Sequence, residues 1–163
     1  MEIKKKIFLS FTIITICFIM DRLSKIYIID LFSQSNVNEN IYINPYLNFI
    51  LLWNKGIAFG LFQSEQIFYH LVSGIILMVI ILLIFLLYKA QKKWEMIYFS
   101  LIVGGAIGNF FDRIYYNAVP DFIDLHYEEF HWFTFNVADM CITIGIILYL
   151  IFDMFKFKNK DNE

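Results

Sequence analysis

Four aspartates, Asp21, Asp112, Asp121 and Asp139, stand inside or beside long apolar stretches of this 163-residue chain. Two carboxyl groups a few ångströms apart cannot both ionise readily, so such a pair shares one proton. The ionised acid can take a proton from water while the protonated acid donates to a peptide carbonyl oxygen and later assists departure of the amine. Spacing alone does not choose between Asp121 with Asp139 and Asp21 with Asp112. The residues themselves indicate an acidic polar site.

The composition is that of a membrane protein. Hydrophobic residues make up 60% of the chain and charged residues only 17%, against about 45–50% and about 25% in a typical soluble domain. Disorder and low-complexity structure are therefore excluded. The formal net charge of -2 shows no basic surplus that would attract nucleic acid. We expect one integral membrane domain over residues 1–163.

Four stretches are long and apolar enough to cross a hydrocarbon core of about 30 Å, which takes roughly 20 helical residues. They are 7–31, 67–88, 94–115 and 137–155. The first also resembles a cleavable signal peptide. Asp21, Arg22 and Lys25 interrupt it where a cleavage site would stand, however, and apolar sequence resumes after them. It is therefore predicted to be an uncleaved span.

Lysine placement predicts the orientation, because short cytoplasmic loops are enriched in basic residues. Three groups of lysines flank the spans on one side: Lys4, Lys5 and Lys6; Lys89, Lys92 and Lys93; and Lys156, Lys158 and Lys160. In the opposite connections, 32–66 and 116–136, Lys55 is the only lysine or arginine. Both termini are therefore predicted to be cytoplasmic.

With this orientation the polar residues of the spans share one depth. At about 1.5 Å per residue, Asp21 lies roughly 20 Å across from residue 7, and Asp112 lies roughly 27 Å across from residue 94. The residues at this outer level are Asp21, Lys25, Asn109, Asp112, Arg113, Asn136 and Asp139. Asp121 and Asp124 lie in the connection directly above. Ionisable residues inside a membrane are costly, so they are candidates for a functional site.

Structural explanations exist for many of the same residues. Asp21 and Lys25 are spaced to pair along a helix face. Asn136 is placed to cap a helix with Asp139 three residues later, a feature worth about 1 kcal/mol. The small residues at 104–108 suit close helix packing. Other polar residues are interpreted as solvated loop acids, namely Asp124, Glu128 and Glu129, or as isolated histidines, namely His70, His126 and His131.

The outer connections are expected to contain a small β element. Residues 41–62 mix β-branched and aromatic residues around an Asn54-Lys55-Gly56 turn signal. A short strand is expected at 132–135. The predicted fold is thus an all-α membrane protein with four transmembrane helices and a small extracytoplasmic β element.

Five blocks of the sequence resemble lipoprotein signal peptidase, or signal peptidase II, a family of bacterial membrane aspartyl proteases. They are DRLSK at 21–25, NKGIAFG at 54–60, GGAIGNFFDRI at 104–114, VPDFID at 119–124 and FNVAD at 135–139. Each block alone is weak, but together they are specific. Pro120 and Ile57 depart from the family pattern. Proline lacks a backbone N–H, so we expect a strand edge or a bend at Pro120.

The resemblance implies that Asp121 and Asp139 are catalytic. It further implies that a second set of residues lines and orders the site: Asp21, Lys25, Asn54, Gly56, Asn109, Asp112, Arg113 and Asn136. The implied reaction cleaves a prolipoprotein on the amino side of a diacylglyceryl-modified cysteine, at the outer face of the bacterial inner membrane. No metal or other cofactor is expected. The expected partners are prolipoproteins and membrane lipids, with no nucleic acid, and the chain is expected to be a monomer.

Two other classes of function also fit intramembrane charges. An ion- or proton-coupled transporter subunit would place acids at successive depths to form a relay. A structural membrane scaffold would use its polar residues only to cap and pair helices. The clustering of the acids at one depth favours a peptidase over the relay.

Overall fold

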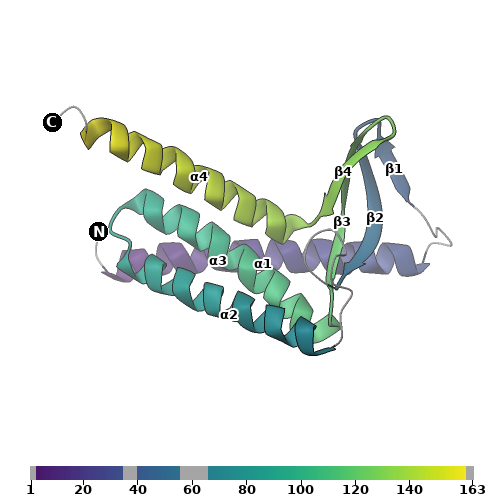
Figure 1. Ribbon diagram of the computed structural model, residues 1–163, viewed down its shortest axis with the longest axis horizontal. Helices are drawn as coiled ribbons and strands as arrows, with labels where there is room; N and C mark the ends of the chain where they lie inside the picture. The colour runs from purple at the N-terminus through teal and green to yellow at the C-terminus, as the bar shows by residue number, and fades with distance from the viewer. Residues whose placement is uncertain (1–2, 35–39, 56–65, 161–163) are drawn as a thin grey trace.

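Four long helices lie where the apolar stretches predict them (Figure 1). The structure is a computed structural model that describes residues 3–34, 40–55 and 66–160. The helices are α1 (Ile3–Gln34), α2 (Gln66–Lys89), α3 (Lys93–Tyr116) and α4 (Val137–Lys160). Each helix contains the whole of its predicted span, so the prediction of helical segments is confirmed.

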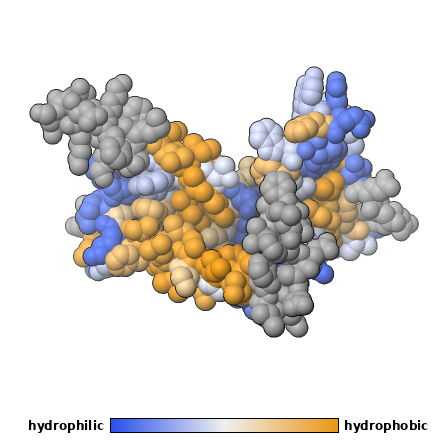
Figure 2. Space-filling view, in the orientation of Figure 1, coloured by the Kyte–Doolittle hydropathy of each residue, from blue (hydrophilic) through white to orange (hydrophobic). Residues whose placement is uncertain are grey.

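The helices have the length and surface of a protein embedded in a membrane. Within the described residues, α1, Tyr69–Lys89 of α2, and α3 are long and apolar enough to cross one, and α4 has a shorter apolar stretch, Val137–Phe152. Met78 on α2 is 70% exposed, as is expected where the surrounding solvent is lipid. Figure 2 shows hydrophobic residues over the helices and hydrophilic ones at the tip of the sheet.

Helix α3 lies at the centre and contacts α1, α2 and α4. Small residues allow this approach. A Cβ atom added to Gly104 would lie 2.8 Å from the Cβ of Cys17 on α1, which is closer than side chains pack. The prediction of a small-residue packing face at 104–108 is confirmed.

Local signals fix both ends of α3. The carboxylate of Glu95 accepts hydrogen bonds from the backbone N–H groups of Gln91 and Lys92, at 2.8 and 3.1 Å, which satisfies donors at the start of the helix. Asn117 ends the helix in the left-handed conformation, with φ 55°. The chain then turns directly into the sheet.

Within the part of the chain that the structure describes, the sheet has four antiparallel strands in the order β1-β2-β3-β4. They are β1 (Ile41–Asn44), β2 (Leu47–Asn54), β3 (Val119–Tyr127) and β4 (Phe130–Phe135). The expected β element at 41–62 supplies the first two strands, and its residues 56–62 lie outside the described part of the chain. Strand β4 confirms the short strand expected at 132–135. No bounds were predicted for β3, which carries Pro120, because its partner β2 is distant in sequence.

Pro120 lies on β3, which has a neighbour on each side. Among the described strands, Pro120 itself pairs only with Trp53 of β2, because the pairing of β3 with β4 begins at Ile123 and Phe135. This end of the strand is therefore an edge, as the missing N–H of proline predicts.

The two ends of the molecule differ. Both chain termini lie at one end, and the sheet lies at the other (Figure 1). Lys6 of α1 donates to the backbone carbonyl of Ala90 at 2.6 Å, which places the first lysine group next to the connection between α2 and α3. The buried charged residues of the helices, Asp21, Lys25 and Asp112, gather at the opposite end, next to the sheet.

Candidate active site

Lys25 occupies the centre of a fully buried charge cluster at the sheet end of the helices. Its Nζ lies 2.8 Å from Asp21 on α1 and 2.6 Å from Asp112 on α3. Lys25 is 1% exposed and both aspartates are 0% exposed. Buried charges persist only where they are paired and hydrogen bonded, so each of these three side chains depends on the others.

Arg22 completes this cluster, although it was not among the predicted site residues. Its guanidinium bridges Asp21, at 2.7 Å, and Asp112. The group also lies over the ring of Phe111, 5.0 Å from the centroid. Two cations thus balance two carboxylates. The signal available in the sequence was a second basic residue inside an apolar span, next to Asp21.

Asn109 connects the charge cluster to Asp139. The Nζ of Lys25 donates to the side-chain oxygen of Asn109 at 2.9 Å, and the Asn109 amide donates to Asp139 at 2.7 Å. Because its oxygen is held by a cation, the Asn109 amide can present only its N–H group to Asp139. The charge cluster therefore orients a donor toward this acid.

Asp21 also anchors the start of α4. Its carboxylate accepts a hydrogen bond from the backbone N–H of Ala138 at 2.9 Å, in the first turn of the helix. Gly108 on α3 leaves room for this carboxylate, since a Cβ there would lie 2.8 Å from Asp21 Oδ2. The position of α4, and of the acid that it carries, thus depends on α1 and α3.

Asn136 joins the two acids Asp139 and Asp121. Its side-chain oxygen accepts from the backbone N–H of Asp139, and its own backbone N–H donates to the Asp139 carboxylate, both at 3.1 Å. This reciprocal pair confirms the predicted helix cap. The Asn136 amide also donates to Asp121 at 2.6 Å. One residue therefore fixes the start of α4 and holds both acids.

Asp121 is 3% exposed and lies on β3, where the sheet meets the helices. Its second oxygen accepts from the side-chain amide of Asn54, the last residue of β2, at 3.0 Å. Burial, reinforced by the negative charge of Asp139, raises the pKa of Asp121 to about 6, while the hydrogen bond from Asn54 opposes this shift. Asn136, which donates to both carboxylates, is the contact that brings the two acids together.

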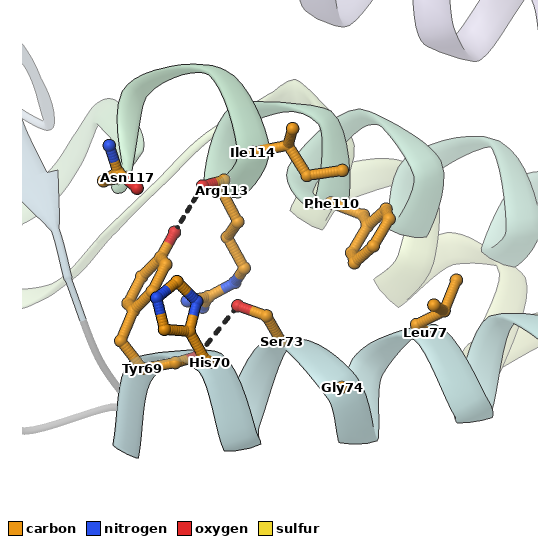
Figure 3. A pocket seen from close by; sticks show the side chains of 9 residues that line it. All are labelled: Tyr69, His70, Ser73, Gly74, Leu77, Phe110, Arg113, Ile114 and Asn117. Atoms are coloured by element: carbon orange, nitrogen blue, oxygen red, sulfur yellow. Dashed lines mark hydrogen bonds between the residues drawn. The ribbon is translucent and has the colours of Figure 1, made fainter. Parts of the chain in front are cut away.

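Arg113 lies apart from this network, in a pocket of about 280 Å³ between α2 and α3 (Figure 3). Its guanidinium lies over the ring of Tyr69, 5.8 Å from the centroid, and the Tyr69 hydroxyl donates to the Arg113 carbonyl at 2.7 Å. Asp112 and Arg113 are consecutive on a helix, so they point about 100° apart. Asp112 faces α1, and Arg113 therefore faces α2.

Eight of the predicted residues are thus joined by successive hydrogen bonds or ion pairs: Asp21, Lys25, Asn54, Asn109, Asp112, Asp121, Asn136 and Asp139. Gly56 and Ile57 lie outside the described residues.

Two expectations about neighbouring side chains were wrong. Asp124 is not a solvated loop acid, because it lies on β3 and is 3% exposed. His126 and His131 are not isolated, because they stack across the β3–β4 hairpin and His131 pairs with Asp124. Glu128 and Glu129 are exposed, as expected.

Comparison with known proteins places this site in a family. The sequence model of the family described as signal peptidase (SPase) II matches residues 13–156. The chain belongs to the signal peptidase II family. It is therefore a protease embedded in a membrane.

The similarity to other signal peptidase II proteins extends over most of the chain. The lipoprotein signal peptidase of Pelagibacter ubique is 47% identical over 160 residues, which is 98% of this chain and 95% of the relative. That of Anaplasma marginale is 40% identical, over 86% of this chain and 81% of the relative. A bacterial membrane enzyme solved by the in meso method at 2.3 Å resolution superposes with a TM-score of 0.78 and 30% identity, covering 94% of this chain and 92% of the other.

Proposed function

We propose that this protease is an aspartyl endopeptidase that removes signal peptides from prolipoproteins by cleaving on the amino side of a diacylglyceryl-modified cysteine. Asp121 and Asp139 are the catalytic acids of this proposal. The observation that carries it is the position of Asn136, which donates to Asp121 through its side chain and to Asp139 through its backbone. A pair of acids that shares one proton must be held together in this way.

The proposed reaction passes protons between the two acids and the substrate. The ionised acid takes a proton from water as the water oxygen bonds to the peptide carbon, and the protonated acid donates to the carbonyl oxygen. The C–N bond then breaks as the departing amine takes a proton from the acid that received it from water. A hydroxyl group of the tetrahedral intermediate returns its proton to the other acid, which restores the pair. Amide donors from Asn54, Asn109 and Asn136 hold the carboxylates in fixed directions, so little reorientation is needed during the reaction.

The membrane arrangement is part of the proposal. All four helices cross the bacterial inner membrane, both termini are cytoplasmic, and residues 1–163 act as a single monomeric domain. The contact of Lys6 with the carbonyl of Ala90 supports a common side for the first two lysine groups. The acids then lie at the outer face, where the end of a signal helix would present its scissile bond.

We further propose that the enzyme recognises the lipid group of the substrate. Leu52 and Trp53, 51% and 39% exposed, precede Asn54 on β2, and Leu52 pairs directly with Asp121. Exposed apolar side chains at this level can contact acyl chains while Asn54 binds polar groups of the substrate beside Asp121. Arg113 would bind other polar groups of the substrate from its separate pocket between α2 and α3. The substrate would thereby be held with its scissile bond over the acids.

A pair of precursors tests the function and the lipid contact separately. The full chain in defined lipid should cleave a diacylglyceryl-modified precursor roughly tenfold or more faster than the same precursor with an unmodified cysteine. Burial of only two additional methylene groups, at about 0.8 kcal/mol each, gives such a ratio. Initial rates at equal precursor concentration measure it. Equal rates would contradict lipid recognition, and failure to cleave either precursor would contradict the proposed activity.

The pH dependence of cleavage should report the hydrogen bond from Asn54 to Asp121. This bond stabilises the ionised carboxylate, so Asn54→Ala should raise the pKa of Asp121 above its value of about 6. The limb of the pH–rate profile that reports Asp121 should therefore move to higher pH. Asn44→Ala, on β1 of the same sheet, is the control. A lower rate with an unmoved profile would show that Asn54 does not tune this acid.

A further inference from the structure

A second polar cluster lies on the β3–β4 hairpin, beyond the proposed catalytic acids. It consists of Asp124, His126 and His131, whose candidate ligand atoms all lie within 4.8 Å of one another. His126 and His131 are directly paired across the two strands, and their rings stack 5.2 Å apart. Backbone pairing therefore holds both imidazoles next to the buried carboxylate of Asp124.

The distances suit a shared ion. Nδ1 of His131 lies 2.9 Å from Asp124 Oδ2, and Nδ1 of His126 lies 3.9 Å from the same oxygen. Two tetrahedral zinc ligands, each about 2.0–2.1 Å from the metal, lie about 3.3 Å apart. The two observed distances fall on either side of this value, so rotation of the His126 ring out of the stack toward Asp124 would bring the three groups onto one ion.

Two buried atoms beside the cluster have unmet bonding capacity. The side chain of His126 is 10% exposed, and its Nδ1 is buried without a hydrogen-bond partner among the described residues. Asn48 pairs with Asp124 across β2 and β3, and its side-chain oxygen is also buried without a partner there. Such groups are costly unless something binds them. A cation next to Asp124 would satisfy the nitrogen directly and would attract the oxygen.

The donor types select the class of ion. Imidazole nitrogen with a carboxylate suits zinc, copper, iron and nickel, whereas calcium and magnesium take oxygen ligands. We propose that Asp124, His126 and His131 bind a divalent transition-metal ion such as Zn²⁺, with the fourth position open to solvent beside the half-exposed His131. The ion links β3, which carries Asp121, to β4, which leads into α4 and Asp139. Its role is to hold the hairpin, and the proposed hydrolysis does not pass through it.

Metal binding to the full chain tests this site. Protein without a histidine tag, stripped by a chelator and held in detergent, should bind one Zn²⁺ per chain in equilibrium dialysis. His131→Ala should weaken binding about tenfold or more, since the loss of even an outer partner of a metal ligand weakens binding by 10–100-fold. Saturating Zn²⁺ should raise the unfolding temperature of the wild type but not of this variant. His131 is half exposed, so the variant should fold, and an unfolding temperature in chelator equal to that of the wild type would verify this.

A second variant that should lose the metal, two matched control variants and one competitor complete the design. Asp124→Asn removes the shared carboxylate and should also lose the metal. His70→Gln removes the remaining histidine of the chain, and Glu129→Gln removes a nearby exposed acid; both should bind Zn²⁺ as the wild type does. Excess Mg²⁺ should not compete. Equal binding by wild type and His131→Ala, no binding by the wild type, or displacement by Mg²⁺ would each overturn the proposal.

Discussion

Replacing Asp139 by asparagine is expected to reduce cleavage by about a thousandfold, because a positioned acid–base group contributes roughly 10²–10⁴-fold. Asparagine keeps the size of the side chain but cannot ionise or carry the shared proton. Asp121→Asn should have an effect of the same order. Single-turnover cleavage of a lipidated precursor measures both losses.

The helix-cap role of Asp139 must be separated from its proposed chemistry. Asparagine can still accept the hydrogen bond from the backbone of Asn136, but its N–H group would then face the N–H group of Asn109. A moderate loss of stability is therefore expected, and thermal unfolding of each variant should be measured beside its activity. Glu128→Gln, at the exposed hairpin turn, is the control and should retain the wild-type rate. Near-normal turnover by Asp139→Asn would leave Asp139 with the role of a helix cap alone.

The helices were predictable because each depends on its own sequence. Inside a membrane, the backbone N–H and C=O groups of an unbroken apolar stretch such as the one in α2 must be hydrogen bonded to one another. A helix achieves this within its own residues. The cap formed by Asn136 and Asp139 was predictable for the same reason, since its two residues are three positions apart.

The features that were missed depend on partners distant in sequence. Strand β3 pairs with β2, about seventy residues earlier in the chain. Asp124 resembled a loop acid because its partner His131 lies across a hairpin that had not been predicted. No spacing rule connects such residues before the sheet is known.

The contrast between Arg22 and Arg113 shows a second limit. Each arginine follows an aspartate inside an apolar helix, and the family resemblance implies a site role for Arg113 alone. The structure places Arg22 between Asp21 and Asp112 and turns Arg113 toward α2. Which arginine contacts Asp21 and Asp112 depends on how α1 and α3 are rotated about their axes. That rotation is set by packing at the small residues of α3, and the local pattern predicts this face but not which helix packs against it.

A substitution in the buried charge cluster should cause the largest loss of folding stability. Lys25→Met preserves much of the side-chain length but removes one of two cations that balance two buried carboxylates. Breaking a buried pair by removing one partner typically costs about 3–5 kcal/mol. The variant should therefore unfold at a much lower temperature in detergent, whereas Lys4→Met, on the exposed start of α1, should not.

A second substitution can restore the balance of charge. In Lys25→Met with Asp112→Asn, one cation and one carboxylate are both absent, and Arg22 still pairs with Asp21. The double variant should therefore be more stable than Lys25→Met alone, with a coupling energy of about 0.5–3 kcal/mol in a double-mutant cycle. Activity should not return with stability, because Asn109 loses the cation that orients its amide toward Asp139. Additive losses of stability in the two single variants would show that Lys25 acts through packing and not by compensating the buried charge of Asp112.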